Sequence, residues 1–319
     1  MIRRRTFVKG MVAATGAAAV TGSWLAFSDG RTARWSRRLL GDFRRSAAPA
    51  PFKPSPAGWS DNQITFAWLG HSTVLINFYG VRILTDPVLA PRIGISTPFG
   101  TLGPKRYIAA ALSPEQLPPI DVVLLSHAHY DHFDTPTLAT LDRGTWIATA
   151  KATADVLDGR FANVNELAWG GHATYHGPKG ELEIQAIEVK HWGERFPSNK
   201  PRGYNGYILR REGKSVLFGG DTALTAAIAA ARPGGPYTAA IMPIGAYQPW
   251  IRNHCTPEQA LEMANTMRAR YILPVHHQTF KLSDEPPLEP IQRLTAALHQ
   301  EPERLGWSQI GQTFVCPAI

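Results

Sequence analysis

The stretch that decides the fold of this chain is Ser126-His127-Ala128-His129-Tyr130-Asp131-His132, which follows the apolar run Val122–Leu125. Such a run leading into a polar loop is typical of a strand that is buried on both faces. Packing alone does not explain three imidazoles and one carboxylate so close together, because each buried polar group needs a partner. Alternate side chains of an extended segment point the same way, so His127 and His129 can bind one cation. The turn that follows directs Asp131 and His132 toward a second cation.

The residues around this motif alternate short apolar runs with amphipathic segments, without an internal repeat, which indicates a layered α/β domain. Strands are expected at Ile64–Trp68, Val74–Phe78, Val81–Thr85, Val122–Leu125, Trp146–Thr149, Leu182–Val189, Tyr207–Arg210, Ser215–Phe218, Ala240–Met242 and Tyr271–Leu273. Helices are expected at Thr135–Leu141, Thr153–Arg160, Leu224–Ala231, Pro257–Met267 and Glu289–Gln300.

The composition is that of a globular chain. Of 319 residues, 44% are hydrophobic and 18% charged, which excludes a disordered, collagenous or coiled-coil protein. The net charge of +8 comes from residues 1–50, because residues 51–319 hold 23 basic and 23 acidic residues. A neutral body argues against a nucleic-acid partner. Two cysteines, Cys255 and Cys316, are too few for a disulfide framework or a zinc-thiolate cluster, and a single bridge between them stays open.

The amino-terminal arm has the features of a targeting signal. Arg3, Arg4 and Arg5 precede an uncharged stretch at residues 10–27, and residues 1–29 resemble a bacterial twin-arginine signal. The alternative is a membrane anchor, since 18 uncharged residues reach the lower limit for a span. We therefore expect the twin-arginine export machinery as a partner and a location in the periplasm or on the periplasmic face of the inner membrane. Residues 30–62 read as a basic, Pro-rich linker suited to anionic lipid, and residues 63–319 as the catalytic domain.

Further candidate metal ligands follow three other predicted strands, in separate segments of the chain. They are His191 in Lys190-His191-Trp192, Asp221 in Gly219-Gly220-Asp221-Thr222, and His276 in Pro274-Val275-His276-His277. Together with the histidine motif, these segments resemble the metallo-β-lactamase superfamily. The resemblance implies a single catalytic domain folded as a four-layer αββα sandwich. It also implies that His127, His129 and His191 hold one metal, that Asp131, His132 and His276 hold the other, and that Asp221 bridges the two.

The kind of metal follows from the donor atoms. Imidazole and carboxylate without thiolate suit zinc, with iron or manganese as alternatives, so we expect two Zn²⁺ ions per chain. Di-iron oxygen reductases of the superfamily carry Glu where this chain has His129, which argues against a redox role. The resembling segment in relatives reads Val-His-Trp-Gly-Thr-Phe, so His277 stands at an aromatic position and is the alternative ligand to His276. Two cations that share a bridging hydroxide can hydrolyse a bound electrophile, with Asp131 orienting the hydroxide.

A closer resemblance narrows the substrate. The blocks that carry it run from about residue 63 to residue 290: Trp68–Thr73, Leu84–Pro87, Gly103–Arg106, Leu117–Asp121, His191-Trp192 with Arg195, Gly219–Thr222 and Ile244–Tyr247. They resemble the N-acylphosphatidylethanolamine phospholipase D family. The implied reaction is zinc-dependent phosphodiester hydrolysis of such a phospholipid, in which a metal-bridging hydroxide attacks phosphorus. The products are N-acylethanolamine and phosphatidic acid.

The same resemblance assigns roles around the metals. It implies a catalytic role for His254 beside the phosphate, as well as for Asp131, and substrate contacts for Tyr130, His71 and Asn253. Asn253 stands where the family has Gln, which leaves the head-group preference open. His71 has the alternative of a hydrogen bond to a metal ligand, and Tyr130 that of a half-buried aromatic. Two other functions remain as alternatives: a lactonase or other carbonyl hydrolase of the same fold, and a non-catalytic metal-binding or lipid-binding protein.

Overall fold

The computed structural model of this chain describes residues 46–97, 100–198 and 200–317. The predicted signal at residues 1–29 and the first part of the predicted linker lie outside these residues. The body forms one unit that begins at Ala47, so the second part of the predicted linker packs with the catalytic domain. Within the described ranges, no helix has the length and apolar character needed to cross a bilayer.

The amino-terminal half and the last strand of the chain build a seven-stranded sheet with the order β15-β1-β2-β3-β6-β7-β8. The strands β1, β2 and β3 pair antiparallel, whereas β3, β6, β7 and β8 run parallel. Their bounds are β1 (Ile64–Gly70), β2 (Thr73–Phe78), β3 (Val81–Thr85), β6 (Val122–Leu125), β7 (Trp146–Ala150), β8 (Asn163–Leu167) and β15 (Thr313–Val315). The parallel arrangement brings the carboxyl ends of β3 and β6 side by side.

The carboxyl-terminal half builds a six-stranded sheet with the order β14-β13-β12-β11-β10-β9. The strands β12, β13 and β14 are parallel and the others antiparallel. Their bounds are β9 (His172–Gly177), β10 (Gly180–Ile187), β11 (Gly206–Arg211), β12 (Lys214–Phe218), β13 (Tyr237–Pro243) and β14 (Ala269–Val275). A separate hairpin joins β4 (Ile95–Thr97) to β5 (Gly100–Leu102).

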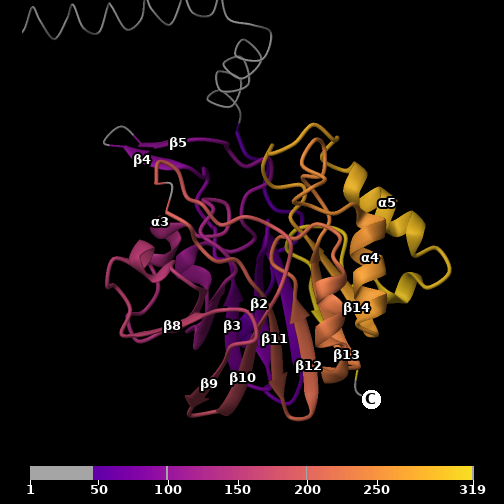
Figure 1. Cartoon of the computed structure of the whole chain (residues 1–319), viewed down its shortest axis with the longest axis horizontal. Coiled ribbons are helices and arrows are strands. Elements are labelled where there is room, and N and C mark those ends of the chain that lie inside the picture. The colour runs from indigo at the N-terminus through magenta and orange to yellow at the C-terminus, as the bar shows by residue number, and fades with distance from the viewer. Residues whose placement is uncertain (1–45, 98–99, 199, 318–319) are drawn as a thin grey trace, which may run out of the picture. The chain divides into compact units, whose positions relative to one another are not determined.

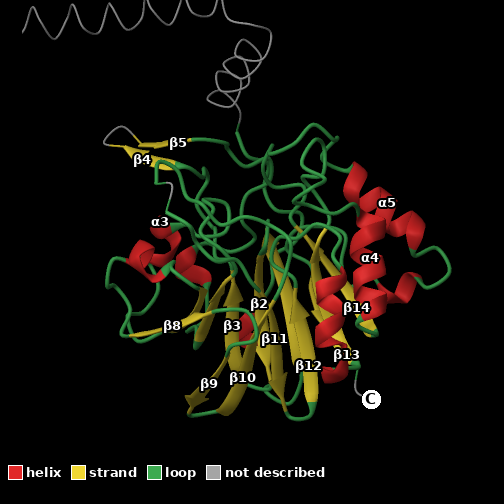
Figure 2. Ribbon diagram, in the orientation of Figure 1, coloured by secondary structure: helices red, strands yellow, loops and turns green. Residues whose placement is uncertain are grey.

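The two sheets pack face to face, with helices on the outside (Figure 2). Alternate residues of one strand serve different layers: Leu209 packs in the core between the sheets, and Ile208 in the core under the helices α4 (Pro257–Thr266) and α5 (Glu289–Ala297). This period of two is what a strand buried on both faces requires. The short helix α3 (Thr135–Leu138) lies beside the first sheet. The αββα architecture is confirmed, with a thin outer layer on the first sheet.

Two helices differ from the prediction. The segment predicted as a helix at Thr153–Arg160 contains only the 3₁₀ helix η3 (Ala154–Leu157), and the segment predicted at Leu224–Ala231 overlaps the 3₁₀ helix η4 (Ala226–Gly234). Asp158 and Gly159 have positive φ and end η3 early, while Pro233 lies inside η4. The helix α4 begins where predicted, with a capping box at Thr256. The remaining 3₁₀ helices are η1 (Pro56–Gly58), η2 (Pro114–Gln116) and η5 (Pro302–Arg304).

The loops that follow β3, β6, β10, β12 and β14 gather at one end of the sandwich, which is the upper end in Figure 1. The β4–β5 hairpin lies at this end as well. Ala48, near the start of the described chain, is bound there too, because its N–H donates to the carbonyl of Tyr107, whose own N–H donates to the carbonyl of Thr279. This end, called the loop end below, is where the predicted metal ligands lie.

Candidate metal centre

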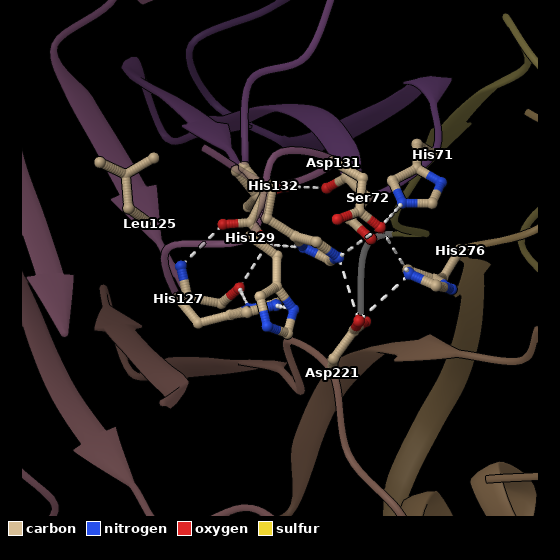
Figure 3. A network of polar contacts seen from close by, with 12 residues as sticks. His71, Ser72, Leu125, His127, His129, Asp131, His132, Asp221 and His276 are labelled. Carbon is tan, nitrogen blue, oxygen red and sulfur yellow. Dashed lines mark hydrogen bonds and ion pairs between the residues drawn. The ribbon is translucent and has the colours of Figure 1, made fainter. Parts of the chain in front are cut away.

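The histidine motif occupies the loop after β6, as predicted, and neighbouring segments fix its course. The backbone N–H of Ser126 donates to Oδ1 of Asp86 at 2.7 Å, which ties the end of β6 to the end of β3. His127 forms an isolated bridge with Tyr204. The chain then turns, and the N–H of Phe133 donates to the carbonyl of His129 at 2.8 Å. The turn brings Asp131 and His132 toward Asp221 and His276, as Figure 3 shows.

His127, His129 and His191 converge to form a three-histidine cluster. Nδ1 of His129 lies 2.8 Å from Nε2 of His127 and 3.2 Å from Nε2 of His191. The far ring nitrogens of two of these histidines have partners, since Nδ1 of His191 donates to the carbonyl of Asn253 at 2.9 Å and Nδ1 of His127 lies 2.9 Å from Oγ of Ser126. Burial lowers the pKa of His127 and His191 well below 6.5 and that of His129 to about 4. Three neutral imidazoles therefore direct lone pairs at one point.

Asp131, His132, Asp221 and His276 form a second group, the carboxylate cluster. Oδ2 of Asp221 lies 3.1 Å from Nε2 of His132 and 3.1 Å from Nε2 of His276. The same oxygen is 3.7 Å from Nε2 of His191 in the three-histidine cluster. Oδ2 of Asp131 lies 3.5 Å from Nε2 of His276 and 3.6 Å from Nε2 of His132. Oδ2 of Asp221 therefore lies near ligands of both clusters, and Figure 3 shows its contacts with His132 and His276.

Charge governs the carboxylate cluster more than burial does. Burial alone would lower the pKa of His132 and His276, but Asp221 and Asp131 outweigh it. The pKa of His132 is raised well above 6.5 and that of His276 to about 9. The surrounding imidazoles in turn hold the pKa of both carboxyls well below 3.8, against the effect of burial. Without a cation, this cluster keeps protons at neutral pH that a metal ion would replace.

Buried partners orient the carboxylate cluster. Nδ1 of His132 donates to Oδ2 of Asp86 at 2.6 Å, which leaves Nε2 free to face Asp221. Nε2 of His71 lies 3.0 Å from Oδ2 of Asp131. His71, Asp86 and His276 all have positive φ, at 52°, 33° and 63°. Such backbone is unfavourable for residues other than glycine and is concentrated at functional sites.

The residues present fit a pair of metal ions. Nε2 of His132, Nε2 of His276 and Oδ1 of Asp221 are buried without a hydrogen-bond partner. An unpaired polar atom in a protein interior is costly, and here both imidazole nitrogens converge on the same carboxylate, each 3.1 Å from Oδ2 of Asp221. Imidazole and carboxylate donors with hydrogen-bonded far sides are the usual environment of a bound transition metal.

The structure distinguishes His276 from His277, which the sequence left as alternatives. His276 faces Asp221, whereas the ring of His277 stacks on Trp68 with centroids 4.5 Å apart. His277 thus packs as the aromatic residue expected at its position would. The geometry favours His276 as the ligand.

A cleft of about 350 Å³ opens over the clusters, lined by His129, Asp131, Asp221, His276, His254, Tyr130, Trp192, Glu194, Arg195, Phe196, Ala246, Trp250 and Leu282. His254 is buried beside the metal ligands, with Nδ1 3.9 Å from Oδ2 of Asp221. Tyr130 lines the cleft, and its hydroxyl donates to the carbonyl of Phe196 at 2.7 Å. His71 is buried and does not line the cleft, so its contact with Asp131 indicates a positioning role rather than a substrate contact. Asn253 contributes its backbone carbonyl to His191.

The comparison with known families decides which group of proteins this is. A family model described as the beta-lactamase superfamily domain matches residues 81–277, which include all the predicted metal ligands. The chain belongs to the metallo-β-lactamase superfamily. The family and the fold class predicted from the sequence are both confirmed, and the chain is a metal-dependent hydrolase.

Two relatives within the metallo-β-lactamase superfamily have names that state an activity. The N-acyl-phosphatidylethanolamine-hydrolyzing phospholipase D 1 of Caenorhabditis elegans is 31% identical over 256 residues, which cover 74% of this chain and 70% of that protein. The mitochondrial enzyme of the same name in Saccharomyces cerevisiae is 31% identical over 239 residues, covering 71% of this chain and 50% of that protein. Among solved structures, the metallo hydrolase Igni18 of Ignicoccus hospitalis has a TM-score of 0.60 at 22% identity and covers 81% of this chain and 100% of its own. At that identity the likeness shows the fold alone.

Arg195 and Asp86 contribute to this metallo-β-lactamase site in ways that sequence reasoning missed. Nη1 of Arg195 donates to the carbonyls of Ala128 and Phe133, at 2.8 and 3.0 Å, and its guanidinium stacks on the ring of Tyr130 at 3.8 Å. Arg195 therefore ties the loop of His191 to the histidine motif. A charged residue four positions after a predicted ligand was the available signal. For Asp86, the signal was an acidic residue directly after a strand.

Proposed function

We propose that this hydrolase is a di-zinc phosphodiesterase of the phospholipase D type, acting on N-acylphosphatidylethanolamine-like lipids. The observation that carries the proposal is Asp221, a single buried carboxylate placed between two ligand clusters at the floor of an aromatic-walled cleft. The names of the two relatives that are 31% identical support the lipid class.

Zinc suits both donor sets, because the seven residues offer imidazole and carboxylate atoms and no thiolate. A pair of such ions supplies Lewis-acid activation of a phosphoryl oxygen and a hydrolytic nucleophile at neutral pH. The residues that would hold the first are His127, His129 and His191. Those for the second are Asp131, His132 and His276, with Asp221 shared.

His254 and Asp131 have distinct tasks in this proposal. His254 is buried, its pKa is lowered to about 4 by burial, and its Nδ1 has no hydrogen-bond partner. It therefore presents a neutral imidazole to a phosphoryl group in the cleft. Asp131 is held by His71 through Oδ2, which fixes its orientation toward the reacting centre.

The cleft wall suits a lipid with a polar head. Trp192, Phe196, Trp250 and Leu282 supply apolar surface, while the metal ligands and His254 form a polar floor. A phosphodiester with attached acyl chains can place its phosphate on the floor and its chains against the wall.

The decisive experiment incubates zinc-loaded protein with N-acylphosphatidylethanolamine and measures phosphatidic acid and N-acylethanolamine by mass spectrometry. We expect both products, their loss on chelation, and recovery on adding zinc. Asp131→Asn should lower the rate by about 10²- to 10³-fold, as expected for removing one electrostatic group at a reacting centre. Metal-replete protein that is inert on phosphodiesters but cleaves lactones or nitrocefin would instead establish a carbonyl hydrolase.

The proposed cellular location follows from the predicted signal at residues 1–29. We expect export by the twin-arginine machinery, which places the enzyme in the periplasm or on the periplasmic face of the inner membrane. Fractionation of cells that express the tagged full chain tests this. Replacing Arg4 and Arg5 together by Lys should retain the protein in the cytoplasm, and unchanged export would contradict a twin-arginine route.

A further inference from the structure

One loop contributes an alternating set of side chains to the cleft at the loop end. Trp192, Glu194 and Phe196 stand at every second position after His191, and all three line the cleft. Alternate side chains of an extended segment point the same way, which accounts for this grouping. Glu194 is exposed, and its carboxylate is not one of the predicted metal ligands. One wall of the cleft therefore carries an acidic side chain between two aromatic ones.

The backbone on both sides of Glu194 is held in place. A Cβ on Gly193 would lie 2.5 Å from the carbonyl oxygen of Arg202, so only glycine fits this close approach of two chain segments. On the other side, Arg195 donates to two carbonyls of the histidine motif and its turn. Because both neighbours are fixed, the Glu194 side chain starts from a fixed point in the cleft wall.

Glu194 gives this wall a negative charge that is not neutralised within the protein. In the described part of the chain, its carboxylate forms no ion pair. The carboxylates of Asp131 and Asp221 face imidazoles instead, and Arg195 is engaged by backbone carbonyls. The charge of Glu194 reaches the metal centre, since it acts to raise the pKa of His129 against the effect of burial. A cation bound in the cleft would therefore be attracted to Glu194.

Two indole rings of the same cleft are also held in place. The ring of Trp192 packs against the rings of His191 and His129, with centroids 4.2 and 4.6 Å apart. Nε1 of Trp250 donates to the carbonyl of Leu282 at 3.3 Å. Among aromatic side chains, tryptophan attracts cations most strongly, and aromatic rings are the usual binding partners of quaternary ammonium groups. Indoles and a carboxylate that line one cleft thus suit a ligand with an ammonium group.

We propose that Glu194, Trp192 and Trp250 form a subsite for a cationic ammonium group beside the metal centre, which we call the ammonium subsite. Its ligands are phosphodiesters whose alcohol is an amino alcohol such as ethanolamine or choline. The inference deepens the proposed function and rests on it for the position of the phosphate, over the metal ligands. The N-acylated lipid has a neutral amide where these substrates have a charge. The subsite therefore adds a second, charged group of substrates at the same centre.

Hydrolysis of such a substrate needs no further reactant. The oxygen of water forms a bond to phosphorus, the bond from phosphorus to the oxygen of the amino alcohol breaks, and that oxygen takes up the proton that water gives up. The ammonium group stays at the far end of the leaving alcohol. Glu194 therefore determines specificity through the charged end of the substrate and does not contact the reacting atoms.

The test uses full-length, zinc-loaded protein and two ligands of the same shape. Phosphocholine carries a quaternary ammonium, whereas its isostere dimethylbutyl phosphate has carbon in place of nitrogen and no positive charge. The variant is Glu194→Gln, which removes the charge and nearly keeps the shape. The matched control is Glu188→Gln, because Glu188 is also exposed, precedes His191 by three positions and does not line the cleft. Isothermal titration gives the dissociation constants, and zinc content is measured alongside.

We expect the wild type to bind phosphocholine about tenfold more tightly than the neutral isostere, from a cation–π contact together with a partly shielded ion pair. In Glu194→Gln the ratio of the two affinities should fall to about twofold, which the rings alone would retain. In Glu188→Gln the ratio should equal that of the wild type. Added salt should lower the wild-type ratio, because it screens the ion pair. Equal wild-type affinities for the two ligands, or an unchanged ratio in Glu194→Gln, would overturn the inference.

The outcome separates from that of the proposed function, because ligand binding requires no turnover. A charge-dependent ratio that Glu194→Gln lowers, combined with no cleavage of any phosphodiester by the wild type, would leave the ammonium subsite standing and remove the phospholipase. Cleavage of N-acylphosphatidylethanolamine, combined with equal affinities for the two ligands, would do the reverse. Where the wild type cleaves that lipid, it should also cleave phosphatidylethanolamine, and failure to do so would overturn the second group of substrates.

Discussion

The two ligand clusters lie side by side, but the pKa values of their imidazoles are shifted in opposite directions. In the three-histidine cluster, burial leaves neutral imidazoles whose pKa values are below 6.5. In the carboxylate cluster, Asp131 and Asp221 raise the pKa of His132 and His276 above 6.5, so that a metal ion would have to displace their protons. The first cluster is therefore ready for a metal at neutral pH, and the second must release protons to bind one.

The largest effect should come from the residue that joins the two clusters. Asp221→Asn removes a charge that both ions would share, and we expect hydrolysis to fall by about 10³-fold or more. Metal analysis should show one ion per chain, retained by the three-histidine cluster. Two ions per chain in this variant would mean that the clusters do not depend on a shared carboxylate.

The next effect is a difference in pH dependence. The pKa of His276 is raised to about 9 and that of His132 well above 6.5, so a cation must displace protons from both, and affinity should fall by more than about tenfold for each pH unit below neutrality. The pKa of His129 lies at about 4, so protons do not compete there between pH 6 and 8. Zinc competition titrations at pH 6 and 8 should show one pH-dependent and one pH-independent site. Equal dependence at both sites would contradict the comparison.

A smaller effect should separate the clusters by mutation. Asp86→Asn weakens the acceptor that orients His132, and we expect about 10- to 100-fold lower affinity at the carboxylate cluster. Ser126→Ala is the change to compare, because it removes the contact of Oγ with Nδ1 of His127 and the hydrogen bond from Oγ to Oδ2 of Asp86. It should therefore weaken both clusters, whereas Asp86→Asn acts on the carboxylate cluster. Isothermal titration with zinc distinguishes the two patterns, and the same pattern in both variants would count against it.

The smallest effect concerns the contact between Arg195 and the loop of the histidine motif. Arg195→Lys retains the charge but loses the two-carbonyl contact and the flat stacking on Tyr130, so we expect about a tenfold loss of hydrolysis. Tyr130→Phe keeps the stacking and loses one hydrogen bond, with about a two- to fivefold loss. A Tyr130→Phe loss that exceeds that of Arg195→Lys would instead indicate contact between the hydroxyl and substrate.

Sequence patterns predicted the parts of this molecule that depend on local order. The strands β3 and β6 have the predicted bounds, and α4 begins at the predicted cap, because apolar runs and capping residues act over a few positions. The strands β8 and β9 were missed. Their side chains are mostly partly exposed or exposed, so they carry no apolar run to recognise.

The site shows the same limit. The predicted ligands could be found because each follows a strand, and the structure brings them together. The role of Asp86 could not be found in the sequence. Its contact with Ser126 spans 40 residues and exists only because β3 and β6 are parallel neighbours. The stacking of Arg195 on Tyr130 likewise depends on how two loops from different sheets meet.

The division of the ligands between the sheets has a consequence for maturation. The loop after β6 in the first sheet supplies four of the seven, and loops after β10, β12 and β14 in the second sheet supply three. Ions seated there would cross-link the two halves of the sandwich, so loading and completion of the fold would be one event. An export machinery that transports only folded proteins would then select metal-loaded chains, because chains without metal would not have completed the fold.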